Sequence, residues 1–314
     1  MKKLWVKDIE SGAEVEGVFL VREANLRTAR NGSQYIQADL ADATGQVPAR
    51  MWDANPEIFS KMTVGGFVRI RGRGETYRNR LQVIVGMLMP VDEAEVDMAD
   101  FLPATSADVE GLAAELKEFI GSVGDSNLSS LLDAVFSDAD FAERFKRSPA
   151  ASSYHHAYLG GLLEHTVCVA RLADAVADRY ENLRRDLLVT GALLHDIGKV
   201  EELTVERGLD YTDAGLLVGH VVQGAMMLRR AAAGLADFPE EMLLLLEHLV
   251  LSHHGEFEFG SPKLPSIPEA VALHHIDNLD AKVQAFGKII SEDPNPDANW
   301  TDYSRMFERK LYKK

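Results

Sequence analysis

The chain has 314 residues, 46% of them hydrophobic and 26% charged, a composition that is typical of a globular protein with room for two domains. Its single cysteine, Cys168, excludes an intramolecular disulfide and argues against a cysteine zinc site. No apolar run reaches the ~18 residues of a membrane span, and the first residues lack the apolar core of a signal peptide, so we expect a cytoplasmic protein without a membrane partner.

Charge is unevenly distributed along the chain. The net charge of -16 argues by itself against a nucleic-acid binder. Residues 1–90, however, hold 13 Lys/Arg against 10 Asp/Glu, whereas the remaining residues hold 20 against 39. A weakly basic N-terminal unit therefore precedes an acidic body, a pattern that compositional drift between domains explains as well as nucleic-acid binding does.

Residues 14–90 have the pattern of a small β-barrel. Short alternating or β-rich runs are separated by turn signals such as Asn31-Gly32 and Gly65-Gly66. The predicted strands are 14–21, 34–42, 46–53, 67–75 and 80–88, with a helix-like stretch at 54–62 between the third and the fourth. This order favours a five-stranded OB-fold, which we assign to residues 1–90.

The period of the apolar residues changes after the barrel. Residues 91–106 are acidic, contain a proline and are interpreted as a linker. From residue 107 the pattern becomes helical, with predicted helices at 110–123, 128–136, 163–180, 184–197, 221–234 and 240–254. The prediction is a multidomain chain in which an all-α domain, residues 107–314, follows the small β-barrel.

All ten histidines lie after residue 154, and the most informative of them is in the run TGALLHDIGK. There His195 and Asp196 end an apolar helix, where an imidazole and a carboxylate can converge on one divalent transition-metal ion. His165 and Asp277 are further polar residues in apolar helical stretches, and a buried aspartate is costly without a metal or hydrogen-bond donors. The order is H…HD…D, although a hydrogen-bonded core pair would also explain His195 and Asp196.

The sequence resembles the HD-domain phosphohydrolases and, among them, is closest to the YhaM-type 3′→5′ exoribonucleases. The runs that carry the resemblance are YHHAYLGGLLEHT, LLHDIGK, LEHLVLSHHGEFEFGSPKLP and LHHIDNLDAK, together with the barrel that precedes them. The resemblance implies an OB-fold followed by an HD domain. It also implies a metal-dependent hydrolase that removes nucleotides from the 3′ end through a metal-activated water.

The resemblance further implies a set of site residues. One divalent metal would be held by His165, His195, Asp196 and Asp277. Many two-metal relatives add three histidines, and those at the corresponding places are His220, His253 and His254. Asp196 would bridge the two ions, and Lys199 would lie near the phosphate, so these two are the predicted catalytic residues. Mn²⁺ is the leading ion, with Co²⁺, Fe²⁺, Ni²⁺ and Zn²⁺ as alternatives.

Alternation along the strands predicts which barrel residues face solvent. Phe67, Arg69 and Arg71 share the face opposite Val68 and Ile70. Arginines interleaved with aromatics suit single-stranded nucleic acid, since arginines follow phosphates and rings stack on bases; ordinary surface arginines are the alternative. The nucleic-acid-binding candidates are Tyr35, Arg50, Trp52, Arg69 and Arg71.

Three functions fit these observations. The first is an exonuclease acting on single-stranded RNA, with single-stranded DNA as a second substrate. The second is an HD phosphohydrolase of small nucleotides or cyclic dinucleotides. The third is a nucleic-acid-binding protein with an inactive HD core, against which the complete ligand set argues. The sequence leaves a homo-oligomer open.

Overall fold

The computed structural model describes residues 4–29, 32–77, 80–152, 156–205, 209–295 and 297–314. The chain divides into two compact units, Met1–Ala104 and Thr105–Val205 together with Leu209–Lys314. We call the first the barrel unit and the second the helical unit.

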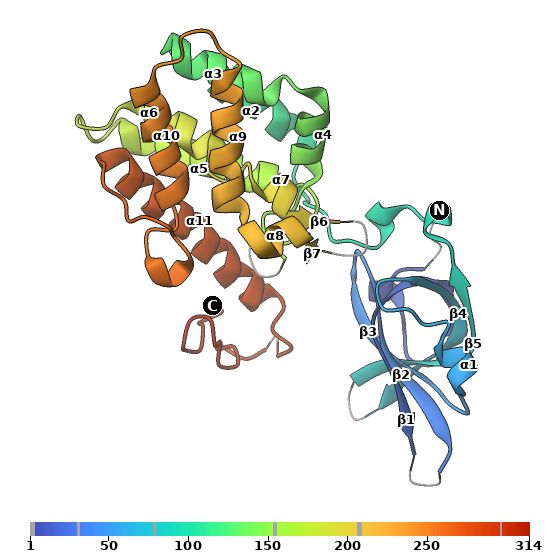
Figure 1. Ribbon diagram of the computed structural model, residues 1–314. Coiled ribbons are helices and arrows are strands. Elements are labelled where there is room, and N and C mark those ends of the chain that lie inside the picture. The colour runs from blue at the N-terminus through green and yellow to red at the C-terminus, as the bar shows by residue number, and fades with distance from the viewer. Residues whose placement is uncertain (1–3, 30–31, 78–79, 153–155, 206–208, 296) are drawn as a thin grey trace. The chain divides into compact units, whose positions relative to one another are not determined.

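The barrel unit is built from five strands (Figure 1). They are β1 (Glu14–Thr28), β2 (Gln34–Asp42), β3 (Gly45–Met51), β4 (Phe67–Tyr77) and β5 (Arg80–Val91), and they close in the order β1-β2-β3-β5-β4. Helix α1 (Pro56–Phe59) lies between β3 and β4, as predicted, although it is shorter than the helix-like stretch at 54–62. The predicted OB-fold is confirmed.

Strand β1 continues seven residues past the predicted end at residue 21. The register between β1 and β2 shifts between Val21 and Glu23, which marks a β-bulge, and pairing resumes up to Thr28 opposite Gln34. A bulge reverses the alternation of side chains from that point onward. The alternation of apolar and polar residues is therefore lost beyond Val21, although the strand itself continues to Thr28.

One side chain of β4, that of Phe67, is buried although the sequence predicted it to be exposed. Phe67 was predicted to face solvent, but it is only 4% exposed. Its ring meets the ring of Phe101 edge-on, with the centroids 4.7 Å apart, and Phe101 is itself buried. Phe101 belongs to the stretch interpreted as a linker, which also contains the 3-10 turns Glu93–Glu95 and Met98–Asp100. This stretch covers part of the barrel.

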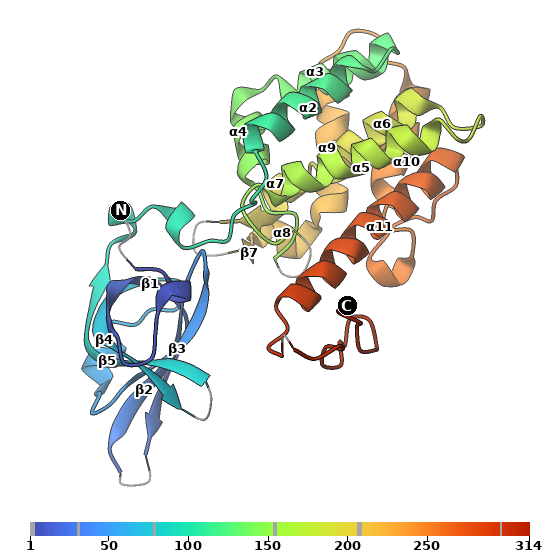
Figure 2. The same cartoon turned by 180° about the vertical axis from the view of Figure 1, so that it is seen from behind.

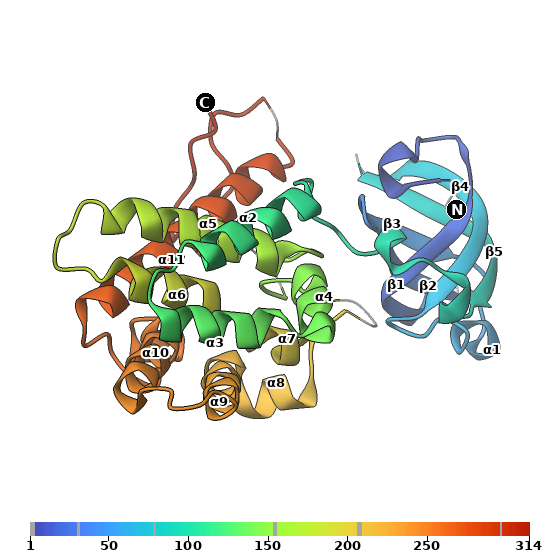
Figure 3. The same ribbon diagram turned by 90° about the horizontal axis from the view of Figure 1, so that it is seen from above.

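The helical unit contains ten helices among the residues that the structure describes. They are α2 (Val109–Gly121), α3 (Ser126–Phe136), α4 (Ala139–Arg147), α5 (Gly161–Ala177), α6 (Arg185–Leu194), α7 (Lys199–Glu202), α8 (Asp213–Val218), α9 (His220–Ala233), α10 (Glu240–Ser252) and α11 (Pro268–Ser291). Helix α5 packs against α2, α4, α6 and α11 and so lies at the centre of the unit (Figures 2 and 3).

The apolar pattern and the caps explain these helices. Every residue of α6 from Leu187 to Leu194 is buried, so its position is fixed by packing on all sides. Aspartates cap the starts of three helices, with the side chains of Asp108, Asp125 and Asp138 accepting hydrogen bonds from the first-turn amides of α2, α3 and α4. Helix α4 was not predicted, because apart from the buried Phe141 and Phe145 its nine residues are mostly charged.

Two short strands interrupt the helical unit. Strand β6 (Leu203–Thr204) pairs antiparallel with β7 (Asp210–Tyr211). With two residues each, they leave the unit helical in character. They place Tyr211 at the edge of the cavity described below.

The contact between Phe67 and Phe101 provides a test of the barrel's extent. We expect Phe101→Ala to destabilise the barrel unit by about 3–5 kcal/mol, because it removes a buried ring and leaves a cavity. Hydrogen exchange should show faster exchange in β3 and β4 and unchanged exchange in α5. Met89→Ala, at an exposed position of β5, is the matched control. A loss below about 1 kcal/mol would show that the contact between Phe67 and Phe101 contributes little to the stability of the barrel.

Candidate metal centre

Four predicted ligands meet in the interior of the helical unit. His165 comes from the middle of α5, His195 and Asp196 follow the end of α6, and Asp277 lies on α11. The Nε2 atom of His165 lies 3.2 Å from His195 Nε2 and 3.2 Å from Asp277 Oδ1. Asp196 Oδ2 lies 3.5 Å from His165 Nε2 and 3.3 Å from His195 Nε2. All three helices bring apolar residues to the core, which holds these polar groups at their shared junction.

A second cluster of donors lies beside the first. His220 begins α9, and His253 and His254 directly follow the end of α10. One ring nitrogen of each lies within 4.8 Å of the others. The second oxygen of Asp196, Oδ1, lies 3.5 Å from His220 Nε2 and 3.6 Å from His253 Nε2. Asp196 thus turns one carboxylate oxygen to each cluster, which is the arrangement expected of a bridging ligand.

Hydrogen bonds fix which nitrogen of each histidine faces the centre. In His195, His253 and His254, Nδ1 donates to a backbone carbonyl, at 2.8, 2.7 and 2.8 Å respectively. In the other two, Nδ1 meets a carboxylate: Glu202 Oε1 lies 2.9 Å from His220, and Asp280 Oδ2 lies 2.7 Å from His165. A proton on Nδ1 leaves the Nε2 lone pair of a neutral imidazole free to bind a metal, and such outer partners orient metal-binding histidines.

Unsatisfied buried atoms indicate what this arrangement lacks. Among the described residues, Asp196 Oδ1, His220 Nε2 and His253 Nε2 are buried without a hydrogen-bond partner. Buried polar atoms are normally paired, because burial without a partner costs free energy. Three such atoms converging from separate elements fit a divalent cation, and the mixture of imidazole and carboxylate suits the borderline transition metals.

Several charged groups surround the carboxylate of Asp196. Burial raises the pKa of Asp196, but the charges of Lys199 and His195 outweigh burial and bring this pKa well below its usual value. The Nζ atom of Lys199 lies 2.6 Å from Asp196 Oδ2. Burial lowers the pKa of this lysine, but the charge of Asp196 outweighs burial, so the pKa is raised overall. Burial lowers the pKa values of His253 and His254, so both rings favour the neutral form that binds a metal.

The pKa of His165 moves in the opposite direction. Burial lowers it, but hydrogen bonds with Asp277 and Asp280 outweigh burial and raise the pKa to about 9. The pKa of Asp277 is lowered, since the stabilisation by His165 exceeds the effect of burial. Without a cation, this pair carries a proton that a metal would displace.

A buried network behind His165 was not anticipated from the sequence. Asp280 accepts from His165 and also lies 3.0 Å from Nε2 of His156, whose Nδ1 lies 2.8 Å from the hydroxyl of Tyr158. That hydroxyl donates to Glu164. The spacing of Asp277 and Asp280, three residues apart on one helix face, was the available signal. His156 is itself buried in this network.

The remaining histidines are spread over the same region. His274 is buried, with Nδ1 2.9 Å from the carbonyl oxygen of His253, so it supports the position of a predicted ligand. His248 Nε2 accepts a hydrogen bond from the amide of Ser266, and His275 is exposed. His155 lies outside the described residues.

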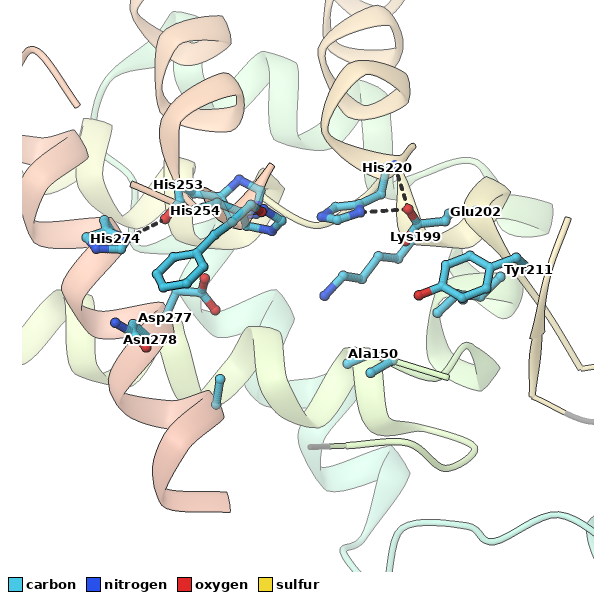
Figure 4. A pocket seen from close by; sticks show the side chains of 14 residues that line it. Ala150, Lys199, Glu202, Tyr211, His220, His253, His254, His274, Asp277 and Asn278 are labelled. Atoms are coloured by element: carbon cyan, nitrogen blue, oxygen red, sulfur yellow. Dashed lines mark hydrogen bonds and ion pairs between the residues drawn. The ribbon is translucent and has the colours of Figure 1, made fainter. Parts of the chain in front are cut away.

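A cavity of about 330 Å³ opens onto the second cluster (Figure 4). Its volume lies at the lower end of the range for small-molecule sites. Lys199 points into it, and His253, His254 and Asp277 line one side (Figure 4). The other lining residues are Ala150, Ala151, Glu202, Leu203, Tyr211, His220, Phe259, His274, Asn278 and Ala281.

The predicted nucleic-acid-binding residues of the barrel fall into two groups. The rings of Tyr35 on β2 and Trp52 after β3 lie 5.0 Å apart, and the Arg50 guanidinium carbon lies 6.0 Å from the Trp52 centroid and 5.6 Å from that of Tyr77. We call Tyr35, Arg50, Trp52 and Tyr77 the aromatic cluster. Tyr77 was not predicted, because it lies beyond the part of β4 that was assigned from the sequence.

The other two candidates lie apart from this cluster. Arg69 pairs with Met89, and Arg71 pairs with Met87, whereas Tyr77 pairs with Arg80 at the far end of the same strands. Six residues of strand, about 20 Å, separate Arg71 from Tyr77. Arg71 also binds Glu16 of β1 at 2.9 Å. The structure therefore does not bring Arg69 and Arg71 together with the aromatic rings.

Comparisons with known proteins agree with both units. Residues 162–282 match the HD domain family, and residues 13–91 match the OB-fold nucleic acid binding domain family. Part of the barrel unit also resembles the second OB-fold domain of replication protein A from Methanococcus maripaludis, with 14% identity, 28% of this chain and 94% of that chain covered, and a TM-score of 0.25. A replication protein A heterotrimer bound to single-stranded DNA gives 28% identity, coverage of 29% and 66%, and a TM-score of 0.22.

A relative in Bacillus velezensis matches most of the chain. The 3′-5′ exoribonuclease YhaM of that organism is 36% identical over 275 residues, which are 87% of each protein. None of the helices in the described ranges combines the length and the apolar character that a membrane span requires. The OB-fold, the HD domain and this extent of identity show that the chain belongs to the family of the YhaM 3′-5′ exoribonucleases.

Proposed function

We propose that the protein is a metal-dependent 3′→5′ exonuclease that hydrolyses single-stranded RNA. The observation that carries the proposal is the position of Asp196 between two histidine clusters at a cavity, in a chain of the YhaM family. Single-stranded DNA remains a second candidate substrate, because it has the same phosphodiester bond and lacks only the 2′-hydroxyl of the RNA backbone.

The donors divide into two proposed ion sites that share Asp196. His165, His195 and Asp277 would complete one site, and His220, His253 and His254 the other. Mn²⁺ is our first candidate for both, with Co²⁺, Fe²⁺, Ni²⁺ and Zn²⁺ as alternatives for the same donor set. When bound, divalent ions would activate a water molecule and offset the charge of the entering and leaving oxygens.

Lys199 is the residue that we assign to the phosphate. Its side chain is buried apart from the tip that points into the cavity, and its raised pKa keeps the ammonium charged. A positive charge in a confined site stabilises the negative charge that develops on phosphate oxygens during hydrolysis. Asp196 holds the ammonium in place through the 2.6 Å ion pair.

The cavity suits the end of a single strand. Tyr211 and Phe259 contribute rings at its edge and remain 41% and 57% exposed, so a base could stack on either without displacing the core. Stacking on aromatic rings is tolerant of sequence and requires unpaired bases. A duplex end offers no such unpaired base, which favours a single-stranded substrate.

The aromatic cluster of the barrel is our proposed strand-binding surface. It lies on β2 and β3 and at the β4–β5 end, which are the elements that OB-folds use to bind oligonucleotides. Two neighbouring rings beside an arginine provide base stacking and a phosphate contact together. Arg69 and Arg71 stay as predictions, since they lie on another part of the barrel.

The direction of degradation can be tested with RNA ends. With Mn²⁺, a 5′-labelled single strand should give a ladder of progressively shorter labelled products, and a 3′ phosphate or a 3′ end paired in a hairpin should slow the reaction sharply. Asp277→Asn should lower the rate by more than about 100-fold, because loss of an outer partner alone typically costs 10- to 100-fold. His275→Gln, an exposed position on α11, is the control. Equal cleavage of a circular RNA would show an endonuclease instead.

Metal binding should release a proton from His165. Its pKa of about 9 means that the ring is protonated at pH 7 in the metal-free protein, whereas a metal requires the neutral ring. Raising the pH removes this competing proton, so the affinity for Mn²⁺ should rise by about tenfold per unit between pH 7 and 8. Calorimetry in buffers of different ionisation enthalpy should count at least one proton released at pH 7. A value of zero would contradict the protonated His165–Asp277 pair.

The two groups of barrel residues can be separated by mutation. Trp52→Ala should weaken the binding of a 20-nucleotide single strand by about 5- to 150-fold, which corresponds to the free energy of stacking one base. Arg71→Ala should have a smaller effect, because this side chain is engaged with Glu16. Fluorescence anisotropy in EDTA measures both affinities without hydrolysis. If Arg71→Ala weakened binding more than Trp52→Ala, the strand would follow β1 and β4 and not the aromatic cluster.

A further inference from the structure

We propose that residues 299–314, called here the 299–314 hairpin, form a second binding surface for single-stranded RNA on the helical unit. The inference rests on the proposed function, because it concerns the strand whose 3′ end would enter the cavity. Three features of the hairpin support it: its fixed conformation, its exposed rings and cations, and its position along α11.

The hairpin folds back on itself after α11 (Figure 2). Antiparallel bridges join Trp300 to Tyr312 and Ser304 to Arg309. The amide of Thr301 donates to the carbonyl oxygen of Leu311 at 2.9 Å, and the amide of Leu311 donates to the hydroxyl of Thr301 at 3.0 Å. These bonds hold the segment in one conformation, so its side chains have defined inner and outer faces.

The inner face anchors the hairpin to the helical unit. Phe307 packs edge-on against Phe286 of α11, with the ring centroids 5.2 Å apart, and Leu311 is buried. The Nζ atom of Lys313 lies 2.7 Å from Asp293 Oδ1, and both side chains are shielded from solvent. Binding of a strand would therefore require little ordering of this surface, which lowers its entropic cost.

The outer face combines aromatic rings with positive charge. Trp300, Tyr303 and Tyr312 are 54%, 61% and 49% exposed, and the rings of Trp300 and Tyr312 lie 5.1 Å apart. The exposed cations beside them are Arg305, Arg309, Lys310 and Lys314. Residues 299–314 hold five Lys/Arg against two Asp/Glu, a reversal of the acidic balance of the chain after residue 90. Stacking rings beside cations are the features that single-stranded nucleic acid requires.

The position of the hairpin connects it to the cavity. Asn278 and Ala281 of α11 line the cavity, and Phe286, on which the hairpin packs, lies five residues beyond Ala281. At 1.5 Å per residue this is about 7.5 Å along the same helix. A strand whose terminal nucleotide occupies the cavity could therefore place its preceding bases on the hairpin. The hairpin cations would also offset the repulsion between RNA and the acidic unit.

The test removes the cations and one ring separately in the full chain. In EDTA, the triple variant Arg305→Ala/Arg309→Ala/Lys310→Ala should bind a 5′-fluorescein 20-nucleotide RNA more weakly. The slope of log affinity against log salt should fall in magnitude by about 2, because each phosphate contact on a single strand contributes about 0.7. Tyr303→Ala should weaken binding by about 5- to 150-fold. Hydrolysis of bis-p-nitrophenyl phosphate with Mn²⁺ should be unchanged, since this small substrate does not reach the hairpin.

A matched control variant shows whether the effect is specific to the hairpin. Arg179→Ala/Tyr180→Ala removes an exposed cation and ring at the turn between α5 and α6, far from the hairpin in two views (Figures 1 and 3), and should bind RNA normally. Normal affinity and salt dependence in the hairpin variants would overturn the inference, as would a change confined to the oligomeric state in sedimentation equilibrium. If the unmodified protein bound RNA through the hairpin but did not shorten the RNA, the proposed exonuclease function would be wrong, whereas the inferred RNA-binding surface would be supported.

Discussion

The burial of the Asp196 carboxylate among histidines is the constraint on which the helical unit depends. Asp196 is 2% exposed, and its two oxygens face ring nitrogens from four different places in the chain. A buried carboxylate requires positive charge, which the ammonium of Lys199 and the proton shared near His165 supply in the described part of the chain. One lysine cannot satisfy both oxygens and the unpaired histidine nitrogens. A divalent cation at each face would satisfy them, which supports the proposed pair of ion sites.

Backbone geometry keeps the two clusters close enough to share that carboxylate. A Cβ atom on Gly198 would lie 2.1 Å from the carbonyl oxygen of His220 and 2.7 Å from the amide nitrogen of Gly224. Only glycine lets the turn after His195-Asp196 touch the start of α9, which carries His220. Gly255, which follows His253 and His254, has φ +76°, and a Cβ there would lie 2.2 Å from Nδ1 of His274. A glycine is therefore also needed where the chain after α10 passes His274 on α11. The motif LLHDIGK therefore encodes a close approach of helices as well as two ligands.

The sequence predicted the fold class and most of the candidate site, and the failures have physical causes. Periodicity and turn residues located all five strands, because the buried face of a small barrel leaves a clear alternation. They could not predict that Phe67 would be covered by Phe101, since the cover comes from a segment without periodicity. They also placed Arg69 and Arg71 with the aromatics, because alternation identifies the face of a residue but not its position along the strand. The seven metal-ligand assignments stay predictions, although the structure brings their side chains together. Asp280 was missed because its partner, His165, is 115 residues away.

The charges of the two units determine how the proposed RNA contacts would act together. The acidic helical unit repels a polyanion over most of its surface, and this repulsion acts over about 8–10 Å at physiological ionic strength. On this unit, attraction is then confined to places where charge is reversed, which are the proposed metal centre with Lys199 and the 299–314 hairpin. A strand held at both would gain affinity through effective concentration, whereas a nucleotide released in the cavity would keep only the first. Weak retention of the product and strong retention of the polymer would follow from the same charge distribution, which is what repeated removal of terminal nucleotides requires.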